Sequence, residues 1–252
     1  MDSLRTMLVM IELELRRLKH DRTELYTRAV QPILWIIIYG PIMSAFMGPI
    51  NGIPYTAYIT PGVLIQSTTF VSIFYGLTIV WERDSGILKK LLVTPASRYA
   101  TVIGRSMASG VRAIFQALII VPVALLIGVR FFPNIGYFVS AIVVIFFASG
   151  GFAAISILVA SLMKTRERFM GIGQAITFPL FFASNALYPV NKMPLILQKF
   201  SSVNPMSYIV DAVRNLMVTG DLHSLPIDLG AIAIFDAVMF IIASVSFKRI
   251  IE

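Results

Sequence analysis

Six long, mostly apolar segments constrain the fold of this chain more than any other feature. Each holds about 20 residues or more, the length at which an α-helix crosses the hydrocarbon core of a bilayer. The segments are 29–48, 58–80, 107–128, 136–162, 169–188 and 226–247. Because lipid offers no partner to free backbone N–H and C=O groups, segments that cross it must be helices. We therefore predict an all-α membrane protein with six transmembrane helices.

Composition supports this class of protein. Hydrophobic residues make up 57% of the chain and charged residues only 13%, whereas a soluble domain carries about 25% charged residues. Cysteine is absent, which excludes disulfides and thiolate metal sites, and the chain has only two histidines. We therefore expect neither a metal site nor a catalytic centre in this chain.

Basic residues alternate from loop to loop, which indicates the orientation. Lys and Arg gather before the first segment, between 81 and 106, between 164 and 168, and in the tail. The positive-inside rule then places both termini and the 81–106 loop in the cytoplasm of a multi-pass plasma-membrane protein. The 189–225 segment lies outside, since long loops weigh less in this rule. The alternation explains much of the +8 net charge, so we expect no nucleic-acid partner.

Residues 1–28 form a separate cytoplasmic unit ahead of the transmembrane domain, 29–252. Leucines recur there at three- and four-residue spacing with charged residues between them, which predicts an amphipathic helix. One interpretation is a helix on the inner leaflet, with its arginines near anionic membrane lipids. Another is a docking surface for a cytoplasmic partner, and the two are compatible. Farther along, we expect Arg112 to lie at the inner boundary and snorkel toward water.

The stretch VWERDSGILKKLLVTPASR interrupts the apolar sequence between the second and third segments. Its hydrophobic residues Ile87, Leu88, Leu91 and Leu92 share one helical face, and lysines occupy the other. Thr94-Pro95 ends the pattern. The spacing predicts a short amphipathic helix over about 82–92, which either lies at the interface or acts as a lever between a soluble partner and two membrane helices.

Two motifs resemble those of a known family. WERDSGILKKLLVTPASRYATVIGRSM resembles the first cytoplasmic loop of type 2 ABC-transporter permeases. FPLFFASNALYPVNKMPLILQKFSSVNPMSYIVDAVRNLM, residues 178–217, resembles the fifth span and outer segment of that family, with Tyr-Pro, Met-Pro, Asn-Pro and a late arginine in order. The layout of six spans and an N-terminal amphipathic helix also corresponds. Asn185 is a departure, since many relatives have glycine there.

The resemblance implies the membrane subunit of an exporter, working as a homodimer with two ABC ATPase subunits. ATP and Mg would bind to the partner, since this sequence has no G-x-x-x-x-G-K-[ST] phosphate loop and we expect no bound cofactor. The implied ATPase-coupling residues are Glu82, Arg83, Gly86, Leu88, Lys89, Leu91, Leu92, Thr94 and Pro95. The implied substrate-pathway residues are Gln66, Phe70, Ile73, Gln174, Phe178 and Phe182. The outer re-entrant segment, about 189–225 and preceded by Asn185, would form a gate from Asn185, Pro189, Asn204, Pro205, Tyr208 and Arg214.

We expect export of a lipophilic or amphipathic cargo, drug-like or lipidic, with a lipid-linked polysaccharide as the alternative cargo. A rival from another class is an ion-coupled carrier that uses Asp236, an ionisable residue in the middle of the sixth segment. A structural role, with Asp236 protonated and hydrogen-bonded to a neighbouring helix, is the other interpretation. An intramembrane enzyme lacks support, because no nucleophile, metal ligands or paired carboxylates come together. In the outer segment, Asp211 and Arg214 are three residues apart and are expected to pair.

Overall fold

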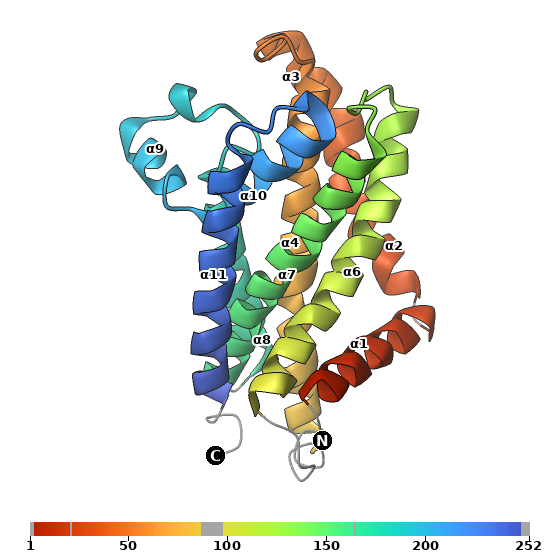
Figure 1. Ribbon diagram of the computed structural model, residues 1–252, viewed down its shortest axis with the longest axis vertical. Coiled ribbons are helices and arrows are strands. Elements are labelled where there is room, and N and C mark those ends of the chain that lie inside the picture. The colour runs from red at the N-terminus through yellow and green to blue at the C-terminus, as the bar shows by residue number, and fades with distance from the viewer. Residues whose placement is uncertain (1–2, 21, 87–97, 164, 248–252) are drawn as a thin grey trace.

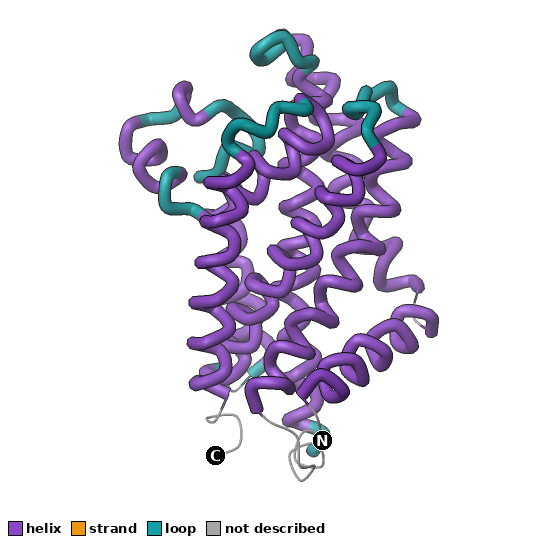
Figure 2. The backbone as a smooth tube through the Cα atoms, viewed as in Figure 1, coloured by secondary structure: helices purple, strands orange, loops and turns teal. Residues whose placement is uncertain are grey.

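The computed structural model describes residues 3–20, 22–86, 98–163 and 165–247. Within these ranges the chain is nearly all helical; it has no strand there, only an isolated bridge between Ile50 and Ile53. Figure 2 shows helices running the length of the bundle, with most loops at one end. The helices are α1 (Ser3–His20), α2 (Arg22–Leu34), α3 (Gly40–Met47), α4 (Tyr55–Asp84), α6 (Arg98–Leu126), α7 (Ile135–Leu162), α8 (Arg166–Phe182), α9 (Leu195–Ser201), α10 (Pro205–Arg214) and α11 (Leu225–Ser246).

Five helical stretches in the described part of the chain are long and apolar enough to cross a membrane. They are Leu25–Met47, Tyr55–Asp84, Tyr99–Leu126, Ile135–Leu162 and Leu225–Ser246. The first joins α2 to α3 through a π-helical turn, Trp35–Tyr39. These five correspond to five of the six expected segments, and the predicted all-helical class with several membrane-spanning helices is confirmed.

The expected segment 169–188 ends earlier than predicted. It corresponds to α8, which has 17 residues and stops at Phe182. A helix of that length spans about 25 Å, against a hydrocarbon core of about 30 Å. The chain after α8 turns back onto α4, where the hydroxyl of Tyr55 donates a hydrogen bond to the carbonyl oxygen of Leu187 at 3.1 Å.

Helix α7 occupies the middle of the bundle and packs against α4, α6 and α11. Small residues allow the close approach to α4. The hydroxyl of Ser156 lies against Gly76, accepts a hydrogen bond from its backbone N–H at 2.7 Å and donates one to the carbonyl of Ile73. At Gly150, the side chains of Met107 and Phe240 occupy the space that a larger side chain would need. These small residues of the fourth segment therefore serve close packing within the chain.

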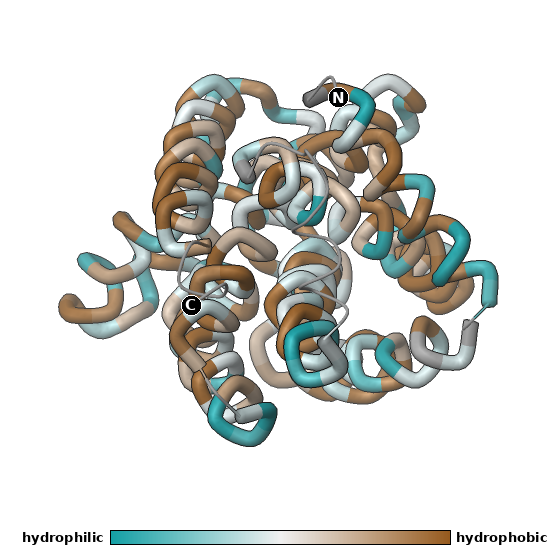
Figure 3. The backbone as a smooth tube through the Cα atoms, turned by 90° about the horizontal axis from the view of Figure 1, so that it is seen from below, coloured by the Kyte–Doolittle hydropathy of each residue, from teal (hydrophilic) through white to brown (hydrophobic). Residues whose placement is uncertain are grey.

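The two ends of the bundle differ in character. The start of α1, the end of α4, the start of α6 and the end of α11 lie at one end, and α3, α9 and α10 lie at the other (Figure 1). Seen from the first of these ends, hydrophobic residues are spread over most of the helices, with hydrophilic residues between them (Figure 3). Below, the first end is called the base and the second the outer end.

Candidate functional site: a charged base, a lateral cavity and an outer cap

A buried carboxylate joins three helices at the base. Glu82, near the end of α4, is 7% exposed. It accepts hydrogen bonds from Arg105 of α6 at 2.5 Å and from Arg17 of α1 at 2.9 Å. Burial alone lowers the pKa of Arg17, but its hydrogen bond and attraction to Glu82 raise it overall. The three side chains therefore form a charged cluster that holds α1, α4 and α6 together; we call it the base cluster.

A second ion pair ties α1 to α6, three residues before Arg17 on α1 and seven residues after Arg105 on α6. Arg112 donates from its Nε to the carboxylate of Glu14, and both side chains are buried. The guanidinium also lies 5.4 Å from the centroid of the Tyr75 ring on α4. The expectation that Arg112 snorkels toward water is therefore wrong, because a carboxylate from α1 neutralises it inside the protein.

Helix α1 is amphipathic as expected, but the face that it turns to the bundle is mixed: Glu14 and Leu18 are buried there, while Glu12, Arg16 and Lys19 stay exposed. It packs along α6 and turns Glu14 and Arg17 inward, while Leu4, Leu8 and Leu15 stay exposed. The inward charges are stable here because they meet opposite charges on α4 and α6. Helix α1 is thus held to the bundle by ion pairs as well as by apolar contacts of Leu18 and Ile11.

The predicted coupling residues fall into two groups. Glu82 and Arg83 belong to the last turn of α4, which runs unbroken to Asp84, so the expected short helix does not begin at 82. Gly86 follows with φ +71°, a conformation that favours glycine and ends the helix. The remaining coupling residues, Leu88, Lys89, Leu91, Leu92, Thr94 and Pro95, lie outside the described residues.

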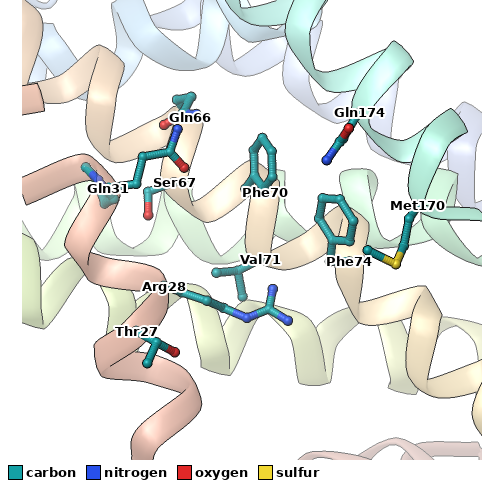
Figure 4. A pocket seen from close by; sticks show the side chains of 11 residues that line it. Thr27, Arg28, Gln31, Gln66, Ser67, Phe70, Val71, Phe74, Met170 and Gln174 are labelled. Atoms are coloured by element: carbon teal, nitrogen blue, oxygen red, sulfur yellow. The ribbon is translucent and has the colours of Figure 1, made fainter. Parts of the chain in front are cut away.

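A cavity of about 320 Å³ opens on the side of the bundle between α2, α4 and α8 (Figure 4). Helix α2 contributes Thr27, Arg28, Gln31 and Pro32; α4 contributes Gln66, Ser67, Phe70, Val71 and Phe74; and α8 contributes Met170 and Gln174. The volume lies at the lower end of the range for small-molecule sites. Three elements that are distant in sequence therefore surround a partly polar, partly aromatic space.

The cavity brings together three of the six predicted pathway residues: Gln66, Phe70 and Gln174. Ile73 does not line it, because its side chain is buried in the core. Phe178 and Phe182 continue along the exposed face of α8, with the Phe178 ring 6.0 Å from that of Phe70. Sequence reasoning missed the α2 residues Arg28 and Gln31, although a basic and an amide residue at the start of an apolar segment were a visible signal.

Arg214 of α10 organises the outer end. Its guanidinium donates to the carbonyl oxygens of Tyr58 at 3.2 Å and Asn185 at 2.8 Å, and to the carboxylate of Asp211 at 2.9 Å. It also lies 3.9 Å from the centroid of the Tyr58 ring. The predicted Asp211–Arg214 pair is confirmed. Burial raises the pKa of Asp211 above its ordinary value, although Arg214 and Asn185 act in the opposite direction.

The other predicted gate residues hold the short outer helices in place. Asn204 caps α10 by accepting from the backbone N–H of Met206 at 3.0 Å, and its amide donates to the carbonyl of Leu180 at 2.7 Å. Pro205 is the first residue of α10. The Tyr208 hydroxyl donates to the carbonyl of Ser202. Asn185 and Pro189, with Tyr58, Asp211 and Arg214, line a polar hollow of about 630 Å³ at this end.

Asp236 of α11 is buried against Gly151 of α7, whose missing side chain makes room for the carboxyl group. Among the described residues, its Oδ1 atom has no hydrogen-bond partner, so the expected bond from that atom to a neighbouring helix is absent there. In the same described ranges, no three His, Cys, Asp or Glu side chains come close enough to hold a metal ion.

Comparison with known proteins identifies the family. Residues 5–218 match the family model described as ABC-2 type transporter. The chain is 29% identical over 206 residues to a putative transport permease, ycf38, of Cyanophora paradoxa, covering 79% of this chain and 70% of that protein. It is 21% identical over 220 residues to nodulation protein J of Rhizobium leguminosarum bv. viciae, covering 86% of this chain and 84% of that protein.

A third relative is the daunorubicin resistance ABC transporter permease protein DrrB1 of Streptomyces coeruleorubidus. It is 24% identical over 203 residues, which cover 79% of this chain and 70% of that protein. The family match extends from α1 through α10 and so includes the base cluster, the lateral cavity and the contacts of Arg214 at the outer end. The chain is a membrane transport permease that belongs to the ABC-2 type transporter family.

Proposed function

We propose that this chain is the membrane subunit of an ATP-driven exporter for lipophilic or amphipathic molecules. Two copies would assemble with two separate ABC ATPase subunits, which bind ATP and Mg. In this proposal α8 also spans the membrane, as the fifth of six spans, both termini are cytoplasmic, and the base of the bundle faces the cytoplasm of a plasma membrane. The relative named for daunorubicin resistance supports a drug-like cargo.

The base cluster is the observation that carries this proposal. Residues 87–97 connect α4 to α6, and the two helix ends that flank them are tied together by Glu82 and Arg105 at 2.5 Å. Arg17 adds α1 to the same cluster. A force applied to the connecting segment by a soluble motor would therefore move three helices as one body rather than bend one of them.

The lateral cavity supports an amphipathic cargo. It is lined by residues of α2, α4 and α8, with phenylalanines and amide side chains around the same space (Figure 4). A second copy placed against these three helices would turn the cavity into part of a shared pathway. Phenylalanines would hold an apolar body, and the glutamines and Arg28 would hold a polar end.

The experiment is reconstitution of the purified chain in liposomes with and without an ABC ATPase encoded beside it. The proposal expects a stable complex, ATP hydrolysis and ATP-dependent movement of a fluorescent lipid or of daunorubicin out of the cytoplasmic side. Movement at the same rate without the ATPase, driven by a proton or sodium gradient, would instead favour the ion-coupled carrier.

A lipid-linked polysaccharide remains the alternative cargo. Asn185, Asp211 and Arg214 line the polar hollow at the outer end. This hollow suits a sugar-rich head group better than it suits a compact drug. Transport of a lipid-linked oligosaccharide, with no movement of daunorubicin, would support this alternative.

A further inference from the structure

A groove of about 460 Å³, separate from the lateral cavity, lies between α1, α2 and α6. Helix α1 ends and α2 begins beside α6, nearer to the base than to the outer end (Figure 1). The lining residues are Leu15, Leu18 and Lys19 of α1, Leu25 and Tyr26 of α2, and Phe115, Leu118 and Ile119 of α6. None of them lines the lateral cavity. We call this space the α1–α2 groove.

The α1–α2 groove opens on a part of the chain that meets lipid. Leu25 and Tyr26 begin the spanning stretch Leu25–Met47, and the α6 side of the groove lies inside the stretch Tyr99–Leu126. Side chains at the rim, such as Tyr26 and Leu118, are exposed. Because the hydrocarbon core of a bilayer holds no water, lipid tails cover apolar side chains that are exposed there.

The floor of the groove consists of packed apolar side chains. Leu18 and Leu25 are buried, and with Val111 of α6 they form a small apolar cluster against which Ile119 packs. A floor of this kind holds an acyl chain by van der Waals contact. Lipid is itself as apolar as such a groove, so the tail alone gives little selectivity and the head group must provide it.

Lys19 provides the polar end of the groove. It lies in the last turn of α1, ahead of the first spanning stretch, and it is exposed. Among the described residues no acidic side chain forms an ion pair with it, whereas Arg16 and Arg17 of the same helix pair with Glu12 and Glu82. It is also the only charged residue in the described lining. An ammonium group donates hydrogen bonds and accepts none, so an anionic oxygen is its best partner.

We propose that the α1–α2 groove binds an anionic phospholipid from the leaflet at the base, with an acyl chain along the apolar floor and the phosphate beside Lys19. Phosphatidylglycerol has such a head group. Phosphatidylcholine has the same tails, but its choline offsets the charge of its phosphate. The inference goes beyond the proposed function, because it concerns a membrane lipid rather than the cargo and needs only that the chain lies in a bilayer.

The test uses Tyr26→Trp, which keeps an aromatic ring at the rim and makes it a fluorescent reporter. This variant is reconstituted in phosphatidylcholine bilayers that contain increasing fractions of brominated phosphatidylglycerol or, separately, of brominated phosphatidylcholine. Bromine quenches tryptophan emission at close range, and the parent chain gives the background from Trp35 and Trp81. We expect phosphatidylglycerol to bind beside position 26 about fivefold more tightly than phosphatidylcholine, the effect of one basic residue near an anionic head group.

Further changes in the Tyr26→Trp chain assign the preference to Lys19. Lys19→Gln should abolish the fivefold preference, and Lys19→Arg should retain it. Arg16→Gln is the matched control, because Arg16 is an exposed cation of the same helix that does not line the groove; it should leave the preference unchanged. Quenching by brominated phosphatidylcholine should be the same in all three, which checks that the groove is intact.

Equal binding of the two lipids, or a preference that survives Lys19→Gln, would overturn the inference. Loss of the preference in Arg16→Gln would also overturn it, since the attraction would then come from the overall charge of α1. If neither lipid quenched the reporter, another protein surface such as a second copy would cover the groove, and the lipid would be refuted as its occupant. The measurement needs no ATPase, so its outcome is separate from that of the transport experiment.

Discussion

Arg105 of α6 and Glu82 of α4 meet across 2.5 Å in a part of the base where their side chains are only 4% and 9% exposed. These residues flank the segment 87–97 on its two sides, 23 positions apart in sequence. Removing one partner of a buried pair leaves an uncompensated charge, which is far more costly than losing a surface pair. The stability of the base therefore depends on this contact, and so would the mechanical role that we propose for it.

Substitution of Glu82 by Gln should destabilise the fold strongly. It removes the carboxylate that neutralises Arg105 and Arg17, and breaking such a pair costs about 3–5 kcal/mol. Thermal unfolding of the purified chain in detergent is the measurement. Asp84→Asn is the matched control, because the Asp84–Arg166 pair is largely exposed and should contribute about 0–1 kcal/mol. A similar decrease in thermal stability for both variants would show that the Glu82 carboxylate does not hold the base together.

The Glu14–Arg112 pair should be strongly coupled energetically. Residues 98 positions apart meet in a buried contact between α1 and α6. In a double-mutant cycle of Glu14→Gln and Arg112→Gln, we expect an interaction energy of about 1–3 kcal/mol, because each single change strands the other charge. Additive single effects would mean that α1 is held to the bundle by apolar packing alone.

Gly62 of α4 is expected to tolerate no side chain. A Cβ atom at this position would collide with the backbone of Ala186, which belongs to the turn after α8. Gly62→Ala should therefore push α4 away from the outer end and cost about 1–3 kcal/mol. Gly171→Ala is the control, because that glycine of α8 has nothing within 4 Å and alanine is the better helix former by about 1 kcal/mol. A stable Gly62→Ala variant would contradict the packing of the outer end.

Asp236→Asn separates the exporter from the ion-coupled carrier. Asparagine keeps the shape of the side chain against Gly151, and it removes the ability to carry a proton. If ATP drives transport, we expect transport in reconstituted liposomes to remain close to that of the parent chain. Complete loss of transport in a variant that is folded and still hydrolyses ATP with its partner would favour a role for Asp236 in ion coupling.

Local pattern was enough to predict the helical class and much of the outer end. The five spanning stretches follow from runs of apolar residues, and the break before α10 follows from Asn204-Pro205, where Asn204 acts as the cap and Pro205 as the first helical residue. The Asp211–Arg214 pair follows from spacing on one helical turn. Each of these features depends on residues close together in sequence, which is why sequence alone could give them.

The charged base could not be predicted in the same way. Helix α1 has leucines at helical spacing, a pattern that fits equally well a helix lying on a membrane surface and one packed on the bundle. The sequence places Arg112 at the membrane boundary and does not reveal its partner, because Glu14 is 98 positions away and no local rule connects the two. Arg105 and Arg112 lie on one face of α6, seven residues apart, and that spacing was the available hint of an acidic partner helix.

The central claim is that a separate ATPase, acting on the segment between α4 and α6, drives transport by moving the two helices together. The most direct measurement is ATP hydrolysis and transport, recorded side by side in liposomes for the parent complex, for the permease without its ATPase, and for complexes carrying Gly86→Ala or Leu88→Ala. The account predicts no transport without the ATPase, and continued hydrolysis with reduced transport in the two variants. Full-speed transport without the ATPase would contradict it.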